Sequence, residues 1–199
     1  MIRHTIMNGE KHILITGFGG QGVIMAGDIL GKAATIYDGK FATMTQAYGP
    51  EARGGSCSAQ IIIGEEEVLF PYIKEPNILI CLSQEGYSKN FGSLRQGGML
   101  LLDLDLVRAK DIYPGAAPYT IPATRFAEEL GNKMMANIVM LGFLAAISDV
   151  ISAEALRKAA LTSVPEPTRE INIQAFERGF DYGKATLKSR AKQGVAARY

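Results

Sequence analysis

Tryptophan is absent from this sequence of 199 residues, and cysteine and histidine each occur only twice. Two cysteines, Cys57 and Cys81, are too few for an iron–sulfur cluster, which takes a larger set of thiolates. They lie in apolar stretches typical of strands, so we expect core thiols rather than a disulfide. His4 and His12 are not accompanied by an HExxH pattern or by paired carboxylates, so we predict no metal site.

The sequence also lacks an excess of charge of either sign. It has 21 basic and 20 acidic side chains and a formal net charge of +1. That balance offers no surface for nucleic acid, and we expect the basic tail, residues 184–199, to be the solvated end of a helix. No apolar run reaches the roughly 18 residues of a membrane span. The polar start of the chain predicts no signal peptide, so we expect a cytoplasmic protein without a membrane partner.

Hydrophobic residues make up 47% of the chain, which is enough to bury a sizeable core. We expect one domain, residues 1–199. Apolar runs predict strands at residues 12–16, 40–45, 77–82, 99–102 and 119–121. Helical spacing predicts helices at residues 21–34, 85–91, 124–131, 132–147, 153–161 and from 168 onward. Thr124, Ser152 and Thr168 are predicted to cap three of these helices.

Residues 57–63 and 68–70 flank the turn sequence Gly64-Glu65-Glu66-Glu67, a spacing that predicts an antiparallel hairpin. Elsewhere strands alternate with helices, and several strands are apolar throughout. The fold class that this pattern predicts is α/β, a three-layer sandwich with a largely parallel, Rossmann-like sheet and one antiparallel hairpin.

A glycine-rich turn lies between the first predicted strand and the first predicted helix. Gly17, Gly19 and Gly22 fit the pattern G-x-G-x-x-G, with Gly20 and Gln21 inside it. Such a turn brings free N–H groups and a helix N-terminus together, which favours a phosphate. A turn that only packs the helix against the sheet explains the same glycines. NAD binding is disfavoured, because residues 40–46 contain no acidic side chain for a ribose.

A second unusual segment follows the strand at residues 40–45. It reads Tyr-Gly-Pro-Glu-Ala-Arg-Gly-Gly-Ser over residues 48–56 and includes Arg53, Gly54 and Gly55. We expect it at the carboxyl end of its strand, where open α/β sheets bind ligands. Arg53 is suited to hold a phosphate or a carboxylate. A surface turn with a solvated arginine is the alternative.

Taken together, GFGGQG between strand and helix and the later QAYGPEARGGSCSAQI resemble the gamma subunit, or domain III, of the 2-oxoacid:ferredoxin oxidoreductases. The 2-oxoglutarate type is the most similar. The resemblance extends over about residues 12–183 and includes PNILI at 76–80, Ser83-Gln84-Glu85 and NIVMLG at 137–142.

The resemblance implies an enzyme complex that decarboxylates a 2-oxoacid on thiamine diphosphate, reduces ferredoxin through iron–sulfur clusters and releases acyl-CoA. It implies that thiamine diphosphate, magnesium and the clusters belong to alpha, beta and delta partner subunits, the last ferredoxin-like. This chain would then be a subunit without catalytic residues or activity of its own, and a homodimer is an option for the isolated chain. The sequence agrees, since Gly27-Asp28-Ile29 is not the G-D-G of a metal-bound diphosphate site.

The resemblance also implies that the chain contributes to a coenzyme A site. The residues that carry over are those of the glycine loop and Asn137, to which we add Arg53, Gly54 and Gly55. Some fused relatives have a lysine in the first helix, where this chain has Met25, Ala26 and Asp28. Two alternatives stay open: a purely structural assembly subunit of the same complex, and a stand-alone nucleotide-binding oxidoreductase. The identity of the oxoacid is not encoded in the motifs of this chain.

Overall fold

The computed structural model describes residues 9–49, 54–109 and 118–193. Its strands form one six-stranded sheet in the order β2-β3-β1-β4-β5-β6. The strands are β1 (Lys11–Phe18), β2 (Phe41–Tyr48), β3 (Ser56–Gly64), β4 (Ile78–Cys81), β5 (Met99–Asp103) and β6 (Tyr119–Ile121). The α-helices are α1 (Val23–Lys32), α2 (Gln84–Asn90), α3 (Ala123–Glu129), α4 (Ala136–Ile147), α5 (Ala153–Thr162) and α6 (Arg169–Lys192).

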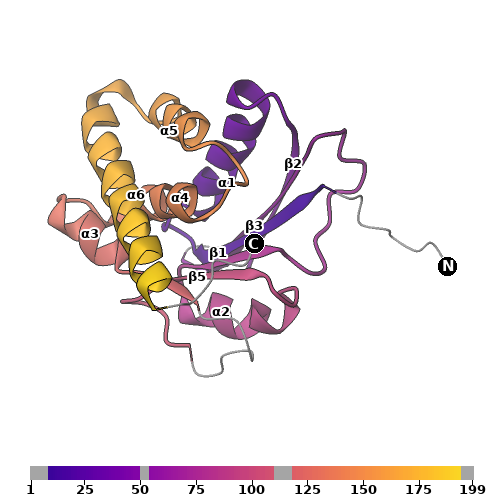
Figure 1. Cartoon of the computed structure of the whole chain (residues 1–199), viewed down its shortest axis with the longest axis horizontal. Coiled ribbons are helices and arrows are strands. Elements are labelled where there is room, and N and C mark those ends of the chain that lie inside the picture. Colours follow the sequence, from indigo (N-terminus) through magenta and orange to yellow (C-terminus); the bar gives the residue numbers. More distant parts are fainter. Residues whose placement is uncertain (1–8, 50–53, 110–117, 194–199) are drawn as a thin grey trace.

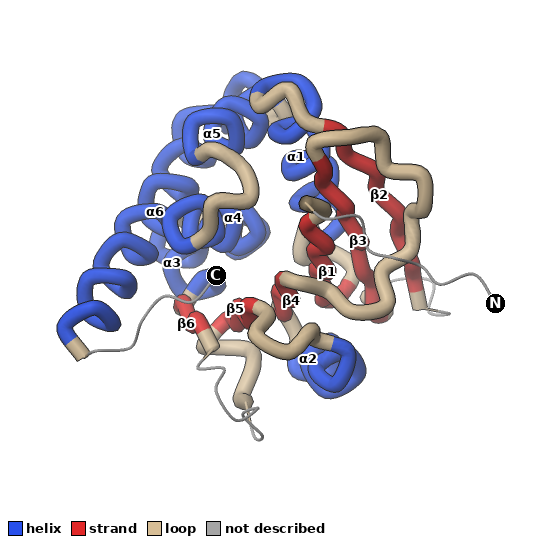
Figure 2. Tube along the Cα trace, turned by 45° about the vertical axis from the view of Figure 1, so that its right-hand side comes forward, coloured by secondary structure: helices blue, strands red, loops and turns tan. Residues whose placement is uncertain are grey.

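The two faces of the sheet are covered unequally, as Figures 1 and 2 show. Alternation along β1 sends Ile13 and Ile15 into the larger core, beneath α1, α4 and their neighbours, and Leu14 into a smaller core beside α2. Helix α4 is apolar nearly all round and lies buried in the larger core. The predicted α/β sandwich is confirmed, with most of the helices on one face.

The parallel part of the sheet consists of β1, β4, β5 and β6. Strands β4 and β5 are buried along their whole length, which explains their uninterrupted apolar runs. Strand β3 runs antiparallel to both of its neighbours, β1 and β2. The sheet is therefore mixed, and its antiparallel part lies at the β2 end.

The predicted hairpin is wrong in its second strand. Residues 68–70 form no strand, and β3 pairs instead with β2 and β1. Both sides of β3 are thereby occupied, so no ladder is open to the segment that follows Gly64. That segment crosses the α2-side face of the sheet, where Thr45 Oγ1 donates to the Pro71 carbonyl (3.4 Å) and Ile73 N–H donates to Gln60 Oε1 (2.9 Å).

Of the three predicted helix caps, one is confirmed. Ser152 Oγ accepts from Ala155 N–H at 3.1 Å and so caps α5. Thr124 is not the cap of α3, because the helix begins at Ala123 and Thr124 lies in its first turn. The N–H of Thr124 donates to Asp103 on β5. The hydroxyl of Thr168 donates to the Pro165 carbonyl and leaves α6 without a side-chain cap.

The C-terminal helix α6 continues through residues 184–192 of the basic tail, while residues 194–199 lie outside the described part. Within residues 9–49, 54–109 and 118–193, no helix combines the length and the apolar character needed to cross a membrane.

Candidate functional site

The two unusual sequence segments meet in the fold. Gly19 N–H, in the turn after β1, donates to the Gly55 carbonyl before β3 at 2.8 Å. A Cβ on Gly19 would sit 3.3 Å from the Gly54 nitrogen, so glycine permits this close approach. Gly54 itself has a positive φ of 70° and open space around it. Arg53, which precedes it, lies outside the described residues.

Gln21 braces the glycine loop from inside. Its Oε1 accepts from Phe18 N–H at 2.7 Å, and its Nε2 donates to the Leu82 carbonyl at 2.8 Å. The side chain thus ties the end of β1 to the end of β4. A Cβ on Gly17 would lie 2.6 Å from the same Oε1, so glycine is needed there for packing.

Asn137 supports the loop from the first turn of α4. It is buried, and its Nδ2 donates to the Gly22 carbonyl at 3.1 Å. Gly22 precedes α1 in the left-handed conformation (φ 70°), and a Cβ there would collide with the Asn137 amide. Asn137 therefore acts on the loop through its backbone and is not among the residues that line the cleft described next.

The chain connections place a cleft beside this loop. Strand β1 leads into α1 on one face of the sheet, and its parallel neighbour β4 leads into α2 on the other face. Open α/β sheets bind ligands at such a reversal, outside the carboxyl ends of the strands. A cleft of about 410 Å³ lies there. Its lining residues are Gly19, Gly20, Gln21, Leu82, Asp103, Leu106, Thr124, Glu128, Lys133, Met134 and Ala136.

The cleft combines a cation, an apolar wall and open backbone. Lys133, in the 3₁₀ turn η3 (Lys133–Met135), and Glu128 in α3 are its exposed charged groups. Leu106 and Met134 present apolar surface, with 39% and 48% of each residue exposed. Gly20 has a positive φ of 96° and no other atom within 4 Å of a Cβ position. Apart from the Glu128 carboxylate, which would repel a phosphate, these groups fit a phosphorylated ligand that also has an apolar arm.

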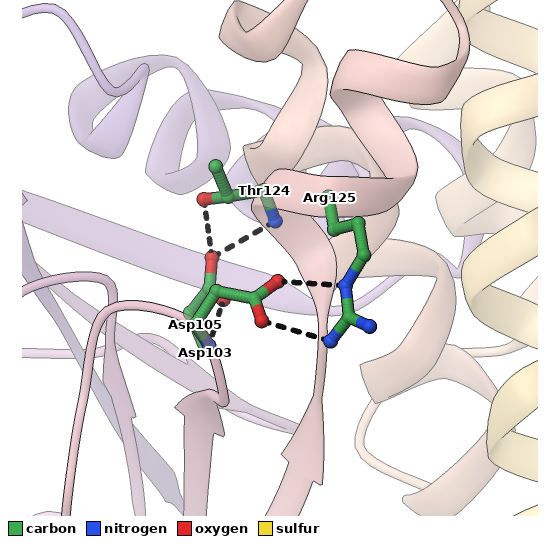
Figure 3. A network of polar contacts seen from close by, with 4 residues as sticks. All are labelled: Asp103, Asp105, Thr124 and Arg125. Carbon is green, nitrogen blue, oxygen red and sulfur yellow. Dashed lines mark hydrogen bonds and ion pairs between the residues drawn. The ribbon is translucent and has the colours of Figure 1, made fainter.

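Asp103, at the end of β5, forms the floor of the cleft on the α3 side. The carboxylate accepts from Thr124 N–H (3.0 Å), Thr124 Oγ1 (2.6 Å) and Asp105 N–H (3.1 Å). Figure 3 shows this network, in which Asp105 also pairs with Arg125. Burial raises the pKa of the Asp103 carboxyl, although the bonds from Thr124 and Asp105 oppose the shift. Asp103 thus positions the start of α3, which forms one wall.

Sequence reasoning found the glycine loop but missed the opposite wall. Asp103 directly follows the buried run Met-Leu-Leu-Leu. A carboxylate at the carboxyl end of a buried strand is a pattern that could have identified Asp103 as a site residue. No sequence pattern marks Lys133 and Met134 as site residues, because only the packing of η3 and α4 brings them to the loop.

A smaller cleft of about 250 Å³ lies on the α2 face of the same sheet edge. Thr16 and Ser58, which face each other across β1 and β3, line it together with Lys89 of α2. Tyr48 and Gly49, just before the segment that carries Arg53, complete its rim. The larger cleft therefore lies against the glycine loop, and the smaller one lies against the end of β1.

Both cysteines are buried and free, as predicted for core thiols. Burial raises the pKa of Cys57, and it raises the pKa of Cys81 to about 12. His4 lies outside the described part, and His12 is buried with its Nε2 at 3.0 Å from Glu10 Oε2. Among the residues that the structure describes, no group of three or more histidine, cysteine or acidic side chains is arranged to hold a metal ion.

Comparison with known proteins assigns the chain to a family. Residues 12–182 match the model described as pyruvate ferredoxin/flavodoxin oxidoreductase. The chain belongs to this family. Within it, the 2-oxoglutarate synthase subunit KorC of Methanocaldococcus jannaschii is 47% identical over 178 residues, which cover 88% of this chain and 95% of the relative.

Solved structures agree with this assignment. A keto/oxoacid ferredoxin oxidoreductase gamma subunit from Geobacter sulfurreducens PCA is 39% identical and has a TM-score of 0.78, covering 89% of this chain and 98% of its own. A 2-oxoglutarate:ferredoxin oxidoreductase from Magnetococcus marinus shares the fold at a TM-score of 0.81. It is 22% identical, and the match covers 89% of this chain and 32% of the longer one. The predicted membership among gamma subunits of 2-oxoacid:ferredoxin oxidoreductases, which are multi-subunit enzymes, is confirmed.

Proposed function

We propose that the chain is the gamma subunit of an enzyme that oxidises 2-oxoglutarate. The reaction joins the acyl group of the oxoacid to CoA, releases CO₂ and passes two electrons to ferredoxin. The 47% identity with a 2-oxoglutarate synthase subunit supports this choice of oxoacid. Thiamine diphosphate, magnesium and iron–sulfur clusters, held by alpha, beta and delta subunits, would supply the chemistry of carbon–carbon cleavage and electron transfer. This chain supplies no catalytic residue and acts as one domain in the cytoplasm.

The share of this chain in the reaction is to bind coenzyme A. The observation that carries the proposal is the cleft beside Gly19, Gly20 and Gln21, with Lys133 and the apolar side chains of Leu106 and Met134 across from the loop. Coenzyme A has phosphates for Lys133 and a long, partly apolar arm for the side chains of Leu106 and Met134. The cleft has room for part of that molecule, so a neighbouring subunit completes the site.

The other predicted site residues have different roles. Gln21 and Asn137 use their amides to hold the loop in shape, at Leu82 and Gly22 respectively. Gly54 and Gly55 directly follow Arg53 in the sequence, and Gly55 accepts a hydrogen bond from Gly19 of the loop. Arg53 is the residue of this segment suited to bind a phosphate or a partner carboxylate.

Replacement of Lys133 by methionine in the reconstituted complex tests the proposal. Loss of one exposed charge-assisted contact to a phosphate is expected to raise the Michaelis constant for CoA about tenfold. Reduction of the clusters by oxoacid alone should not change, because that step precedes CoA. Lys188→Met, on the exposed side of α6, is the matched control and should leave the Michaelis constant for CoA as it is.

A structural assembly subunit is the second candidate function. It is favoured by the internal use of the Gln21 and Asn137 amides and by the packing reasons for Gly17 and Gly22. Titration of the complex with CoA in a calorimeter separates the two candidates. If Lys133→Met lowers the affinity of the complex for CoA, the result supports a CoA site in this chain. An unchanged affinity in that variant supports assembly alone. Oxoacid oxidation by the purified single chain would contradict both.

A further inference from the structure

Strand β2 forms one edge of the sheet, and β3 is the one strand that pairs with it among the residues that the structure describes. Gly49 N–H donates to the Ser56 carbonyl of the β3 side, whereas Lys40 N–H turns away from β3 to Ala34. In an antiparallel ladder the direction alternates from residue to residue. The N–H and C=O groups of Ala42, Met44, Gln46 and Tyr48 therefore point outward. Among the described residues, these groups make no backbone hydrogen bond outside the strand.

This edge has none of the features that usually prevent strand-to-strand association. Soluble proteins protect an edge strand with charged side chains, proline or a bulge. Residues 41–48 read Phe-Ala-Thr-Met-Thr-Gln-Ala-Tyr, with no charge and no proline, and they pair with β3 without a bulge. The neighbouring segment, residues 68–73, is also uncharged. A second copy of the same edge would meet no like charge.

Exposed apolar side chains surround the edge. Phe41, Tyr48, Leu69, Phe70 and Tyr72 each expose between 45% and 80% of their surface. Phe70 and Tyr72 lie with ring centroids 5.5 Å apart, and the Thr45–Pro71 hydrogen bond holds their segment against β2. At about 200 Å² for a whole residue of this size, the five expose roughly 600 Å². A specific interface buries about 800 Å² on each partner, so strand pairing would add the remainder.

We propose that this edge is the interface between two copies of the chain, with β2 pairing antiparallel to β2 of the second copy. A two-fold axis at Thr45 places Met44 opposite Gln46 and Ala42 opposite Tyr48 of the second copy. This register uses every outward-facing residue and keeps directly opposed side chains on one face of the sheet. It also brings the two Pro71 segments, with their exposed aromatic rings, together at the axis.

The edge can be blocked without disturbing the fold of one copy. Gln46 is exposed and its N–H points outward, so proline at this position removes a pairing donor but no bond to β3. Gln46→Ala is the matched control, because it keeps the N–H. The measurement is light scattering of the full-length chain during size-exclusion chromatography from about 10 to 100 µM.

The wild-type chain and Gln46→Ala are expected at twice the monomer mass of 21.5 kDa. Gln46→Pro should elute as a monomer, with a dimer dissociation constant raised roughly a hundredfold. A melting temperature equal to that of Gln46→Ala shows that the monomer is folded, and Gln46→Lys serves as the second blocking variant if proline lowers it. Hydrogen exchange at the amides of Met44 and Gln46 should be slow in the wild type and fast in a blocked variant.

Two outcomes would overturn the proposal. The first is a wild-type chain that is monomeric over the whole range; if its Gln46→Pro variant also fails to join the complex, the edge belongs to a different subunit. The second is a dimer that survives both blocking variants, which places the interface elsewhere. Tyr72→Ser should weaken the dimer, and Leu104→Ser, an exposed leucine outside this patch, should not.

Discussion

The contact between α4 and α6 leads to a quantitative prediction. Gly142 of α4 faces the Phe176 backbone, and Gly179 of α6 faces the backbone of α4. A Cβ on Gly179 would collide with the Val139 carbonyl oxygen and lie 2.9 Å from its carbon and 3.0 Å from the Phe143 nitrogen. These are main-chain atoms of a buried helix, so no side chain can rotate to make room.

The expected loss of stability follows from two opposing effects. Overpacking costs about 1–3 kcal/mol, and a clash with buried backbone belongs at the upper end, about 3 kcal/mol. Alanine in place of glycine within a helix contributes about 1 kcal/mol in the other direction. Gly179→Ala should therefore lower the free energy of unfolding by about 2 kcal/mol. For a chain of this size, that is a decrease of about 4–8 °C in melting temperature.

Thermal unfolding followed by circular dichroism measures this change, with Gly31→Ala as the control. Gly31 lies in α1 with no atom within 4 Å of a Cβ position, so alanine there should raise the melting temperature by about 2–4 °C. If Gly179→Ala melted at or above the wild-type temperature while Gly31→Ala behaved as expected, α4 and α6 would be free to separate. The reasoning from close backbone contact would then be refuted.

Three further predictions concern the cleft and the core. Gly20→Ala should destabilise the fold by about 1 kcal/mol or more in chemical denaturation, because φ is 96° there, whereas Gly19→Ala should have a smaller effect because its φ is not positive. Because burial raises the Asp103 pKa, stability should fall as pH rises from about 4 through the folded pKa, and Asp103→Asn should lack this decline. Cys81, with a pKa of about 12, should react with a thiol reagent at pH 8 only after denaturation, and labelling of the native chain would contradict its burial.

Much of the sheet was predictable because its strands are short and buried on both faces. The runs that became β1, β4, β5 and β6 are apolar with turn residues at their ends, and the chain offers no other way to bury them. The failure at residues 68–70 has a clear origin. Strand propensity and a turn sequence say that two segments are able to pair, but they do not say that β2 and β1 already occupy both sides of β3.

The candidate site, too, was predictable from the sequence only in part. The glycine loop and the segment with Gly54 and Gly55 are visible as local patterns, and their place at the carboxyl ends of strands follows from the fold class. Asp103 and Lys133 were not predicted as site residues. They come from separate elements far along the chain, and only tertiary packing sets their distance from Gly19.

The sequence by itself determined the α/β class and the position of the loop between β1 and α1, because both depend on local spacing of residues, and its motifs carried the resemblance to gamma subunits. Only the tertiary structure decided which neighbour each strand takes, that α2 lies on the face of the sheet opposite to α1 and α4, and that the side-chain amides of Gln21 and Asn137 hydrogen-bond to Leu82 and Gly22. It also left the β2 edge open. Pairing partners and buried contacts are settled by competition across the whole chain, and no local pattern records that competition.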